Sequence, residues 1–141
     1  HFETGSDYTT GKEAAVGTNL EVINTQALEK VQEHFPTAHY SEYMTWYFQN
    51  NPEYFSLNFV DLPKDIIRDY RLTLDYEEDL QMFNIIEKYF TDNGLEYSIR
   101  ALFEFLDNNP KVAEINSNLT LTYRTDTELI DTLNRVTKIM E

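Results

Sequence analysis

Residues 71–80 read Arg71-Leu72-Thr73-Leu74-Asp75-Tyr76-Glu77-Glu78-Asp79-Leu80, and this stretch decides the fold class. Its first four residues suit an extended strand, and the apolar residues that follow Leu80 recur at the spacing of an α-helix. Asp75 therefore stands where a strand is expected to pass into a helix. Ligand sites in α/β proteins concentrate at such junctions, beyond the carboxyl ends of the strands. Asp75 is the first candidate for a functional residue.

Asp75 has two possible roles, and they are compatible. A carboxylate here can bind Mg²⁺, which usually takes one or two protein carboxylates and completes its coordination with substrate phosphates. Asp75 and Glu78, three residues apart, also resemble a capping box at the start of a helix. The acids Glu77, Glu78 and Asp79 suit the positive end of the helix dipole. The local sequence leaves both roles open.

Strand and helix patterns alternate along the rest of the chain, which predicts a layered α/β architecture. Strands are expected at 20–23 and 55–60. Helices are expected from a cap at Asn24 or Thr25 as far as Pro36, and at 41–50, 80–92, 98–108 and 126–140. We expect three parts: a loop and strand entry at 1–18, an α/β part at 19–92 and a helical extension at 93–141. So few strands make a thin sheet for a complete domain of this type, which hints at further strands upstream.

The composition excludes several classes of protein. Acidic residues outnumber basic ones by 25 to 11 in the 141 residues, and the net charge is −14. A nucleic-acid-binding protein needs the opposite balance, because Lys and Arg displace counterions from phosphates. No apolar run approaches the ~20 residues that span a bilayer. Because cysteine is absent, disulfides and thiolate zinc sites are excluded. Taken together, these features lead us to expect a soluble, cytoplasmic protein that binds neither nucleic acid nor membrane.

Three segments of the chain form a pattern when they are taken in order. They are Asp7-Tyr8-Thr9 with Gly17-Thr18-Asn19-Leu20-Glu21-Val22-Ile23 and Ala27-Leu28, then Ser41-Glu42-Tyr43-Met44-Thr45-Trp46-Tyr47 with Asn51-Pro52-Glu53-Tyr54-Phe55, and finally 69–80. Over about residues 6–116 this pattern resembles the bacterial sugar-acid cytidylyltransferases of the spore-coat polysaccharide, acylneuraminate and deoxyoctulosonate types. The resemblance implies the carboxyl-terminal half of such a protein: an α/β, nucleotidyltransferase-like layered fold with a helical C-terminal extension.

The resemblance also implies a function. The parent enzyme would use CTP and Mg²⁺ to activate a sugar acid for surface-polysaccharide synthesis, with release of pyrophosphate. Asp75 matches the family's metal-binding aspartate, whereas Thr73 stands where some relatives carry a second acid. Glu21, Glu42 and Arg71 are the residues expected to bind substrate. No Gly-rich phosphate loop occurs in the sequence, so the CTP-binding loop is expected upstream and the chain alone is expected to be inactive.

A second class of function remains open, a non-catalytic acidic module for interaction or dimerisation. The last expected helix places Leu129, Leu133, Val136 and Met140 on one stripe, which must be buried in its own domain or against a second copy. Residues 43–48 offer another apolar, aromatic surface. Related cytidylyltransferases dimerise through this half of the molecule, so we expect a symmetric homodimer. The resemblance assigns no role to residues 117–141.

Overall fold

The computed structural model describes residues 1–37 and 39–140, except for the side chains of residues 122 and 123. The chain forms two compact units, each assembled from separate segments. Unit 1 contains residues 1–11, 20–60 and 120–141, and unit 2 contains residues 12–19 and 61–119. The expected helical extension at 93–141 is therefore divided, because the chain passes from unit 2 into unit 1 at Thr120.

Unit 1 is built on a three-stranded mixed sheet. The strands are β1 (Tyr8–Gly11), β2 (Glu21–Ile23) and β3 (Leu57–Val60), in the order β2-β1-β3. The central strand β1 pairs antiparallel with β2, where Tyr8 lies opposite Ile23, and parallel with β3, where Tyr8 lies opposite Leu57. The strands expected at 20–23 and 55–60 are thus confirmed, slightly shortened.

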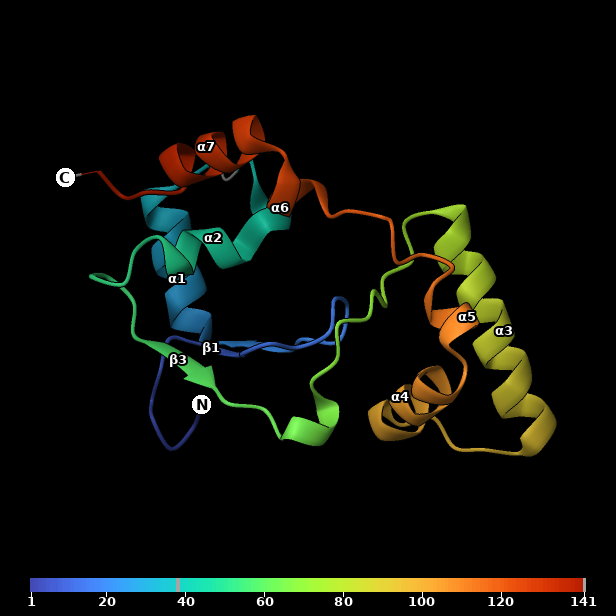
Figure 1. The fold of residues 1–141 in the computed structure, drawn as a ribbon. Helices are drawn as coiled ribbons and strands as arrows, with labels where there is room; N and C mark the ends of the chain where they lie inside the picture. The colour runs from blue at the N-terminus through green and yellow to red at the C-terminus, as the bar shows by residue number, and fades with distance from the viewer. Residues whose placement is uncertain (38, 141) are drawn as a thin grey trace. The chain divides into compact units, whose positions relative to one another are not determined.

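Helices cover one face of this sheet. Helix α1 (Thr25–His34) is capped by Asn24, one of the two residues that the sequence left open for this role. The Asn24 side chain accepts a hydrogen bond from the backbone N–H of Gln26. A 3₁₀ helix, η1 (Ser41–Tyr43), leads into α2 (Met44–Gln49). Figure 1 shows α1, α2 and α7 on the same side of the sheet. The core of unit 1 lies between these layers and contains Tyr8, Ala27, Val31, Tyr47, Phe48, Phe55 and Ile139.

The C-terminal segment docks on unit 1. After the short helix α6 (Thr122–Thr125), α7 (Thr127–Val136) begins at the capping residue Asp126 and places Leu133 in a fully buried position. The helix expected at 126–140 ends four residues early, because the chain leaves the helix at Thr137. The backbone N–H of Ile139 then donates to Asn51 Oδ1 at 2.8 Å, and Ile139 enters the core.

Unit 2 is helical. After the 3₁₀ helix η2 (Lys64–Ile66) come α3 (Glu77–Asn93), α4 (Ile99–Asn108) and α5 (Pro110–Ala113). Helix α3 ends at Gly94, which has a left-handed φ of 60°, and Ser98 caps α4 through the N–H of Ala101. Both boundaries match the sequence predictions. Apolar side chains at helical spacing on α3 pack with α4 to form the core: Met82, Ile86, Phe90, Phe103, Phe105 and Leu106.

The strand expected at 71–74 is not formed. Arg71 makes an isolated parallel bridge with Val16, and the next three residues have no regular structure. A strand is stable only when its backbone groups pair with a neighbour, and within the described chain the 71–74 segment has only this bridge. In the described residues, no helix has the length and apolar character that crossing a membrane requires.

Candidate functional site

The segment that carries Asp75 is held in place by a tight turn at Val16 and Gly17. The N–H of Val16 donates to the carbonyl of Tyr70 at 3.0 Å, and the N–H of Leu72 donates to the carbonyl of Val16 at 2.7 Å. Gly17 has a φ of +88°, and a Cβ at this position would lie 2.2 Å from the Leu72 carbonyl oxygen. Only glycine fits here, because a side chain would both strain the turn and push the backbone of Leu72 away.

Arg71 and Asp79 form a buried ion pair at the start of α3. Arg71 Nε lies 3.0 Å from Asp79 Oδ1, and Arg71 Nη2 lies 3.1 Å from Asp79 Oδ2, so the guanidinium and carboxylate meet through two parallel hydrogen bonds. The side chain of Arg71 is 6% exposed and that of Asp79 is 0% exposed. Such a bidentate pair fixes the plane of the guanidinium.

Further donors complete the environment of Asp79. Asn116 Nδ2 donates to Asp79 Oδ1 at 2.8 Å and to the Arg71 carbonyl at 3.0 Å. The backbone N–H groups of Asp75 and Tyr76 both donate to Asp79 Oδ2, at 2.9 and 3.0 Å. Burial alone would raise the pKa of Asp79. The hydrogen bonds from Arg71, Asn116 and the two backbone groups outweigh it and lower that pKa well below its usual value, so Asp79 is a carboxylate.

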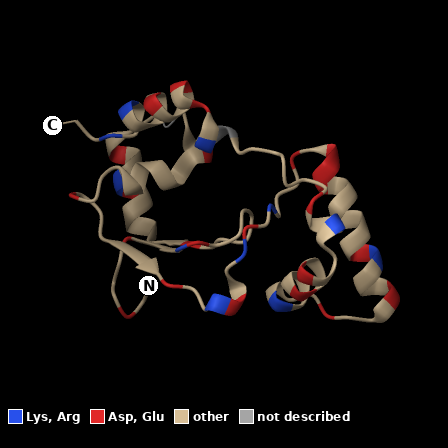
Figure 2. Ribbon diagram, in the orientation of Figure 1, with Lys and Arg blue, Asp and Glu red and all other residues tan. Residues whose placement is uncertain are grey.

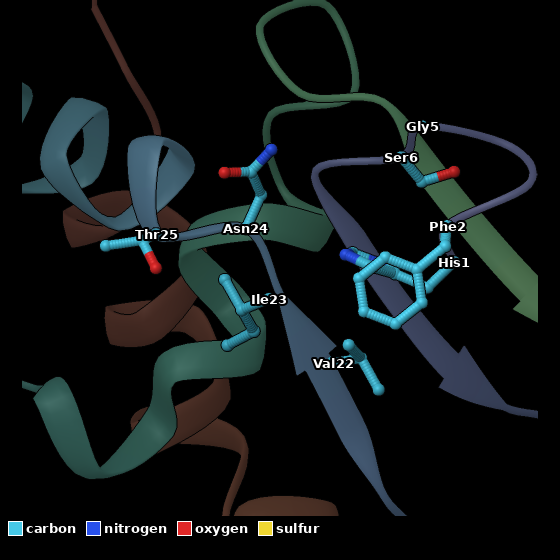
Figure 3. Close-up of a pocket in the computed structure, with 8 residues that line it drawn as sticks. All are labelled: His1, Phe2, Gly5, Ser6, Val22, Ile23, Asn24 and Thr25. Carbon is cyan, nitrogen blue, oxygen red and sulfur yellow. The ribbon is translucent and has the colours of Figure 1, made fainter.

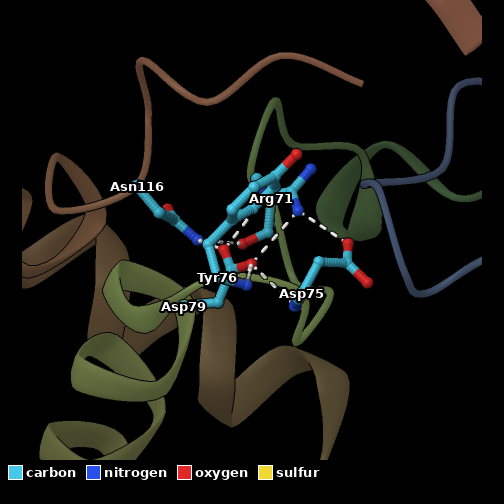
Figure 4. Close-up of polar contacts among 5 residues, drawn as sticks. All are labelled: Arg71, Asp75, Tyr76, Asp79 and Asn116. Carbon is cyan, nitrogen blue, oxygen red and sulfur yellow. Dashed lines mark hydrogen bonds and ion pairs between the residues drawn. The ribbon is translucent and has the colours of Figure 1, made fainter. Parts of the chain in front are cut away.

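Asp75 is the exposed member of the group. Its Oδ2 accepts from Arg71 Nη2 at 2.7 Å, while 57% of its side chain stays open to solvent. Figure 4 shows Arg71 between the two acids, with Asp79 and Asn116 on one side and Asp75 on the other. The arrangement therefore exposes the Asp75 carboxylate to solvent while the buried Arg71–Asp79 ion pair fixes its position. Figure 2 shows the same place as a group of acidic residues at the start of α3.

The helix cap differs from the expected one. The N-cap residue is Tyr76, and the acid that accepts its backbone N–H is Asp79, three residues later. The expected pair was Asp75 and Glu78, one position earlier. The correction has a physical reason: Asp79 is buried and accepts the backbone N–H groups of Asp75 and Tyr76, whereas Glu78 is exposed. Asp75 is therefore not the N-cap residue of α3.

Two buried polar atoms near this group lack a partner within the described part of the chain, Arg71 Nη1 and Thr73 Oγ1. The Arg71 guanidinium also lies over the ring of Tyr76, with Cζ 5.3 Å from the ring centroid. Cation–π contact of this kind offsets part of the cost of burying the charge. Arg71 thus combines an ion pair, an aromatic contact and one unused donor.

Glu21 and Glu42 belong to unit 1. Glu21, at the start of β2, accepts hydrogen bonds at Oε1 from the hydroxyls of Tyr8 and Thr45. Glu42 lies in η1 and is exposed. The structure therefore joins Arg71 to Asp75 within unit 2 and places the two glutamates in unit 1. Their assignment to substrate, like that of Arg71, stays a prediction.

Sequence reasoning missed four residues that organise these groups: Asp79 and Asn116 around Arg71, and Tyr8 and Thr45 around Glu21. Asp79 had a local signal, because it stands three residues after Tyr76 at the capping-box spacing. Asn116 lies 37 positions from Asp79, and Thr45 lies 24 positions from Glu21. Nothing local in the sequence indicates such contacts.

A pocket of about 340 Å³ lies elsewhere in unit 1, next to the start of α1. Its walls include His1, Phe2, Val22, Ile23, Asn24 and Thr25 (Figure 3). None of the predicted site residues lines it, and it contains no carboxylate. The described residues also contain no group of three or more His, Asp or Glu side chains that could hold a metal by themselves.

Comparisons with known proteins agree with the fold described above. No protein-family model matches the chain. It is 32% identical over 114 residues to the uncharacterized protein MJ1063 of Methanocaldococcus jannaschii, covering 80% of this chain and 46% of that protein. It is 30% identical over 115 residues to the spore coat polysaccharide biosynthesis protein SpsF of Bacillus subtilis, covering 80% of this chain and 48% of that protein.

A solved structure of a cytidylyltransferase from Leptospira borgpetersenii matches 85% of this chain and 50% of its own length, with a TM-score of 0.66 and 25% sequence identity. The fold is that of part of a cytidylyltransferase. This confirms the predicted α/β, nucleotidyltransferase-like fold class. The chain is thus similar in sequence to a protein named for spore coat polysaccharide biosynthesis and similar in fold to a solved cytidylyltransferase. The cytidylyltransferase-like chain spans about half the length of the relatives it matches.

Proposed function

We propose that this chain is the carboxyl-terminal, sugar-side half of a nucleotidyltransferase that transfers CMP from CTP to a sugar acid for surface-polysaccharide synthesis. The observation that carries the proposal is the fold match with a cytidylyltransferase over 85% of the chain. The sequence likeness to a protein named for spore coat polysaccharide biosynthesis supports the proposed role in polysaccharide synthesis. The half that binds CTP would be supplied by a further part of the polypeptide.

The proposed reaction is a displacement at phosphorus. A hydroxyl oxygen of the sugar acid forms a bond to the α-phosphorus of CTP, the bond from that phosphorus to the bridging oxygen breaks, and pyrophosphate leaves. The hydroxyl proton passes to water. Positioning of the two substrates and stabilisation of negative charge supply most of the catalysis in reactions of this kind.

Asp75 is suited to hold Mg²⁺ in such a site. Its carboxylate is more than half exposed and stands on a fixed base, and a single carboxylate is enough when substrate phosphates and waters complete the coordination. Bound Mg²⁺ would neutralise charge that develops on the phosphate oxygens. One carboxylate makes a partial site, in which substrate phosphates and waters would supply the remaining ligands.

The buried residues behind Asp75 would set its position. Asp79 holds the Arg71 guanidinium, Asn116 donates to Asp79, and the Arg71 guanidinium donates to one oxygen of Asp75. We also propose that Arg71, the cation next to Asp75, binds substrate, in keeping with its predicted role. We propose Glu21 and Glu42 as the substrate-binding residues of unit 1.

The replacement Asp75→Asn tests the metal assignment. Asparagine keeps the size of the side chain but loses the charge that binds the cation, so catalysis should fall by orders of magnitude, about 100-fold or more. Pyrophosphate release from CTP should be measured in the polypeptide that contains this chain and the CTP-binding half. The 141-residue chain alone is expected to release none.

A matched control is Asp92→Asn. Asp92 pairs with Lys88 four residues away at 2.7 Å and is 58% exposed, so it matches Asp75 in exposure and in the spacing and distance of its basic partner. Line broadening of the chain's NMR signals by Mn²⁺ should centre on residues near 75 and should vanish in Asp75→Asn but not in Asp92→Asn. If the Asp75→Asn variant turns over CTP normally and its Mn²⁺ broadening is unchanged, Asp75 is not a metal ligand.

A further inference from the structure

A hydroxyl–carboxylate cluster joins three segments of unit 1. It consists of Tyr8 on β1, Glu21 on β2 and Thr45 in the first turn of α2, and the two hydroxyls donate to the same oxygen, Glu21 Oε1. These residues come from separate stretches of the chain, 13 and 24 positions from Glu21. Glu21 is an exposed residue at the end of a strand, where a side chain without partners would sample several rotamers.

Tyr8 is a rigid donor. Its side chain is fully buried and its ring stacks on Phe48, with centroids 5.2 Å apart and an interplanar angle of 19°. Burial and the hydrogen bond to Glu21 raise the pKa of Tyr8 above its usual value, so the hydroxyl keeps its proton and donates. The position of the hydroxyl is therefore set by the core of unit 1.

Thr45 supplies the second constraint. Its hydroxyl reaches Glu21 from the helical layer, whereas Tyr8 reaches it from the sheet. With a single donor, the carboxylate could still rotate about that one hydrogen bond. Two donors, one from the sheet and one from the helical layer, remove this freedom. Glu21 Oε2 accepts no hydrogen bond from any residue that the structure describes, so the second oxygen of a fixed carboxylate remains for a ligand.

We infer that Tyr8 and Thr45 are positioning residues that hold Glu21 as an acceptor for the hydroxyl groups of a polyhydroxylated sugar acid, an inference that rests on the proposed function. A carboxylate at a surface accepts hydrogen bonds from hydroxyls and repels other anions. Glu21 therefore contacts the hydroxyl-bearing part of the sugar and not its acid group or a phosphate. The preset geometry lowers the ordering cost of binding.

Binding to the 141-residue chain tests the inference, with N-acetylneuraminate and 3-deoxy-octulosonate as probes and pyruvate as an acid that lacks hydroxyls. Ligand-observed NMR titration should give saturable binding of at least one sugar acid and none of pyruvate. Thr45→Val, which keeps the shape of the side chain but removes its hydroxyl, should raise the dissociation constant about tenfold. Thr45→Ser, which restores the hydroxyl, should recover most of the affinity.

Two further variants separate positioning from folding. Glu21→Gln should weaken binding at least as much as Thr45→Val, and Glu29→Gln, which changes an exposed glutamate on α1, should have no effect. A purely structural cluster would change the unfolding temperature of Thr45→Val and leave the affinity of the folded protein unchanged. That result, or no saturable sugar-acid binding by the unaltered chain, would overturn the inference.

The proposed function is judged separately, by pyrophosphate release in the longer polypeptide. Turnover there, together with equal sugar-acid affinity for the unaltered chain and Thr45→Val, would overturn only the positioning role. If sugar-acid binding depends on Thr45 but the longer polypeptide does not turn over CTP, the proposed transferase function is wrong and the cluster still stands as a sugar-binding site.

Discussion

Asp79 is the residue that most of the candidate site depends on. It is fully buried and accepts hydrogen bonds from the Arg71 guanidinium, the Asn116 amide and two backbone N–H groups at the start of α3. All of these contacts favour the ionised carboxylate, because each one places an N–H donor on it. A neutral side chain at this position leaves the Arg71 charge buried with only the exposed Asp75 as its partner, which is costly.

The replacement Asp79→Asn should therefore destabilise unit 2 by roughly 3–5 kcal/mol near pH 7. The pKa of Asp79 is lowered in the folded protein, so its contribution to stability is complete above the unfolded value near ~3.9 and declines as the pH falls below it. The difference between the two proteins should shrink on going from pH 7 to pH 3, as measured by urea unfolding.

Asp65→Asn is the matched control for this prediction. Asp65 pairs with Arg100 at 2.6 Å, but both side chains are more than half exposed, so solvent screens the pair and its loss should matter little. Equal destabilisation by the two replacements, or a difference between Asp79→Asn and the unaltered protein that stays constant with pH, would contradict the role of Asp79.

At the scale of elements, the segment after α7 is an integral part of unit 1. Asn51 is fully buried and joins α2 to the C-terminal segment: its Nδ2 donates to the carbonyls of Tyr47 and Thr137, and its Oδ1 accepts from Ile139. The segment thereby places Ile139 in the core. Of the apolar stripe, which was expected to be buried in its own domain or against a second copy, Leu133 is buried within unit 1. Ile139 lies in the core of the same unit.

Asn51→Ala should lower the free energy of unfolding of unit 1 by about 2–4 kcal/mol, because three hydrogen bonds are lost and buried backbone groups stay unsatisfied. Asn50→Ala is the control. Asn50 donates through its side chain once, to Thr137 Oγ1 at 2.8 Å, so about 1 kcal/mol is expected. Thermal unfolding of both variants measures the difference, and a smaller effect for Asn51 would show that the tail docks without this link.

At the scale of the whole molecule, the homodimer expected from the resemblance remains a prediction. Light scattering at micromolar concentration should give a mass of twice 16.7 kDa. Of the predicted tail stripe, Met140 is the residue left most exposed, at 86%. Because Leu133 is buried within unit 1 and Leu129 and Val136 are half-buried, Met140→Glu should leave the dimer intact. A monomeric mass for the unaltered chain would remove the dimer, and a monomer only for Met140→Glu would place the interface at the tail.

Local interactions decided what could be predicted without a structure. The starts of α1 and α4 and the end of α3 follow from Asn24, Ser98 and Gly94, which act on backbone groups only a few positions away. Asp75 stood out for the same reason, as an acid directly before a helical pattern. The α/β class followed from the alternation of periodicities, and the fold match confirmed it.

The tertiary structure alone decided the rest, because contacts between distant positions depend on the path of the chain. Residues 71–74 looked like a strand, but within the described chain their only strand pairing is the isolated bridge of Arg71 with Val16, so no ladder forms. Asn116 reaches Asp79 across 37 positions, and Ile139 reaches Asn51 across 88. The two donors that fix Glu21 come from β1 and α2, and only the packing of that sheet against that helix brings their hydroxyls to one oxygen.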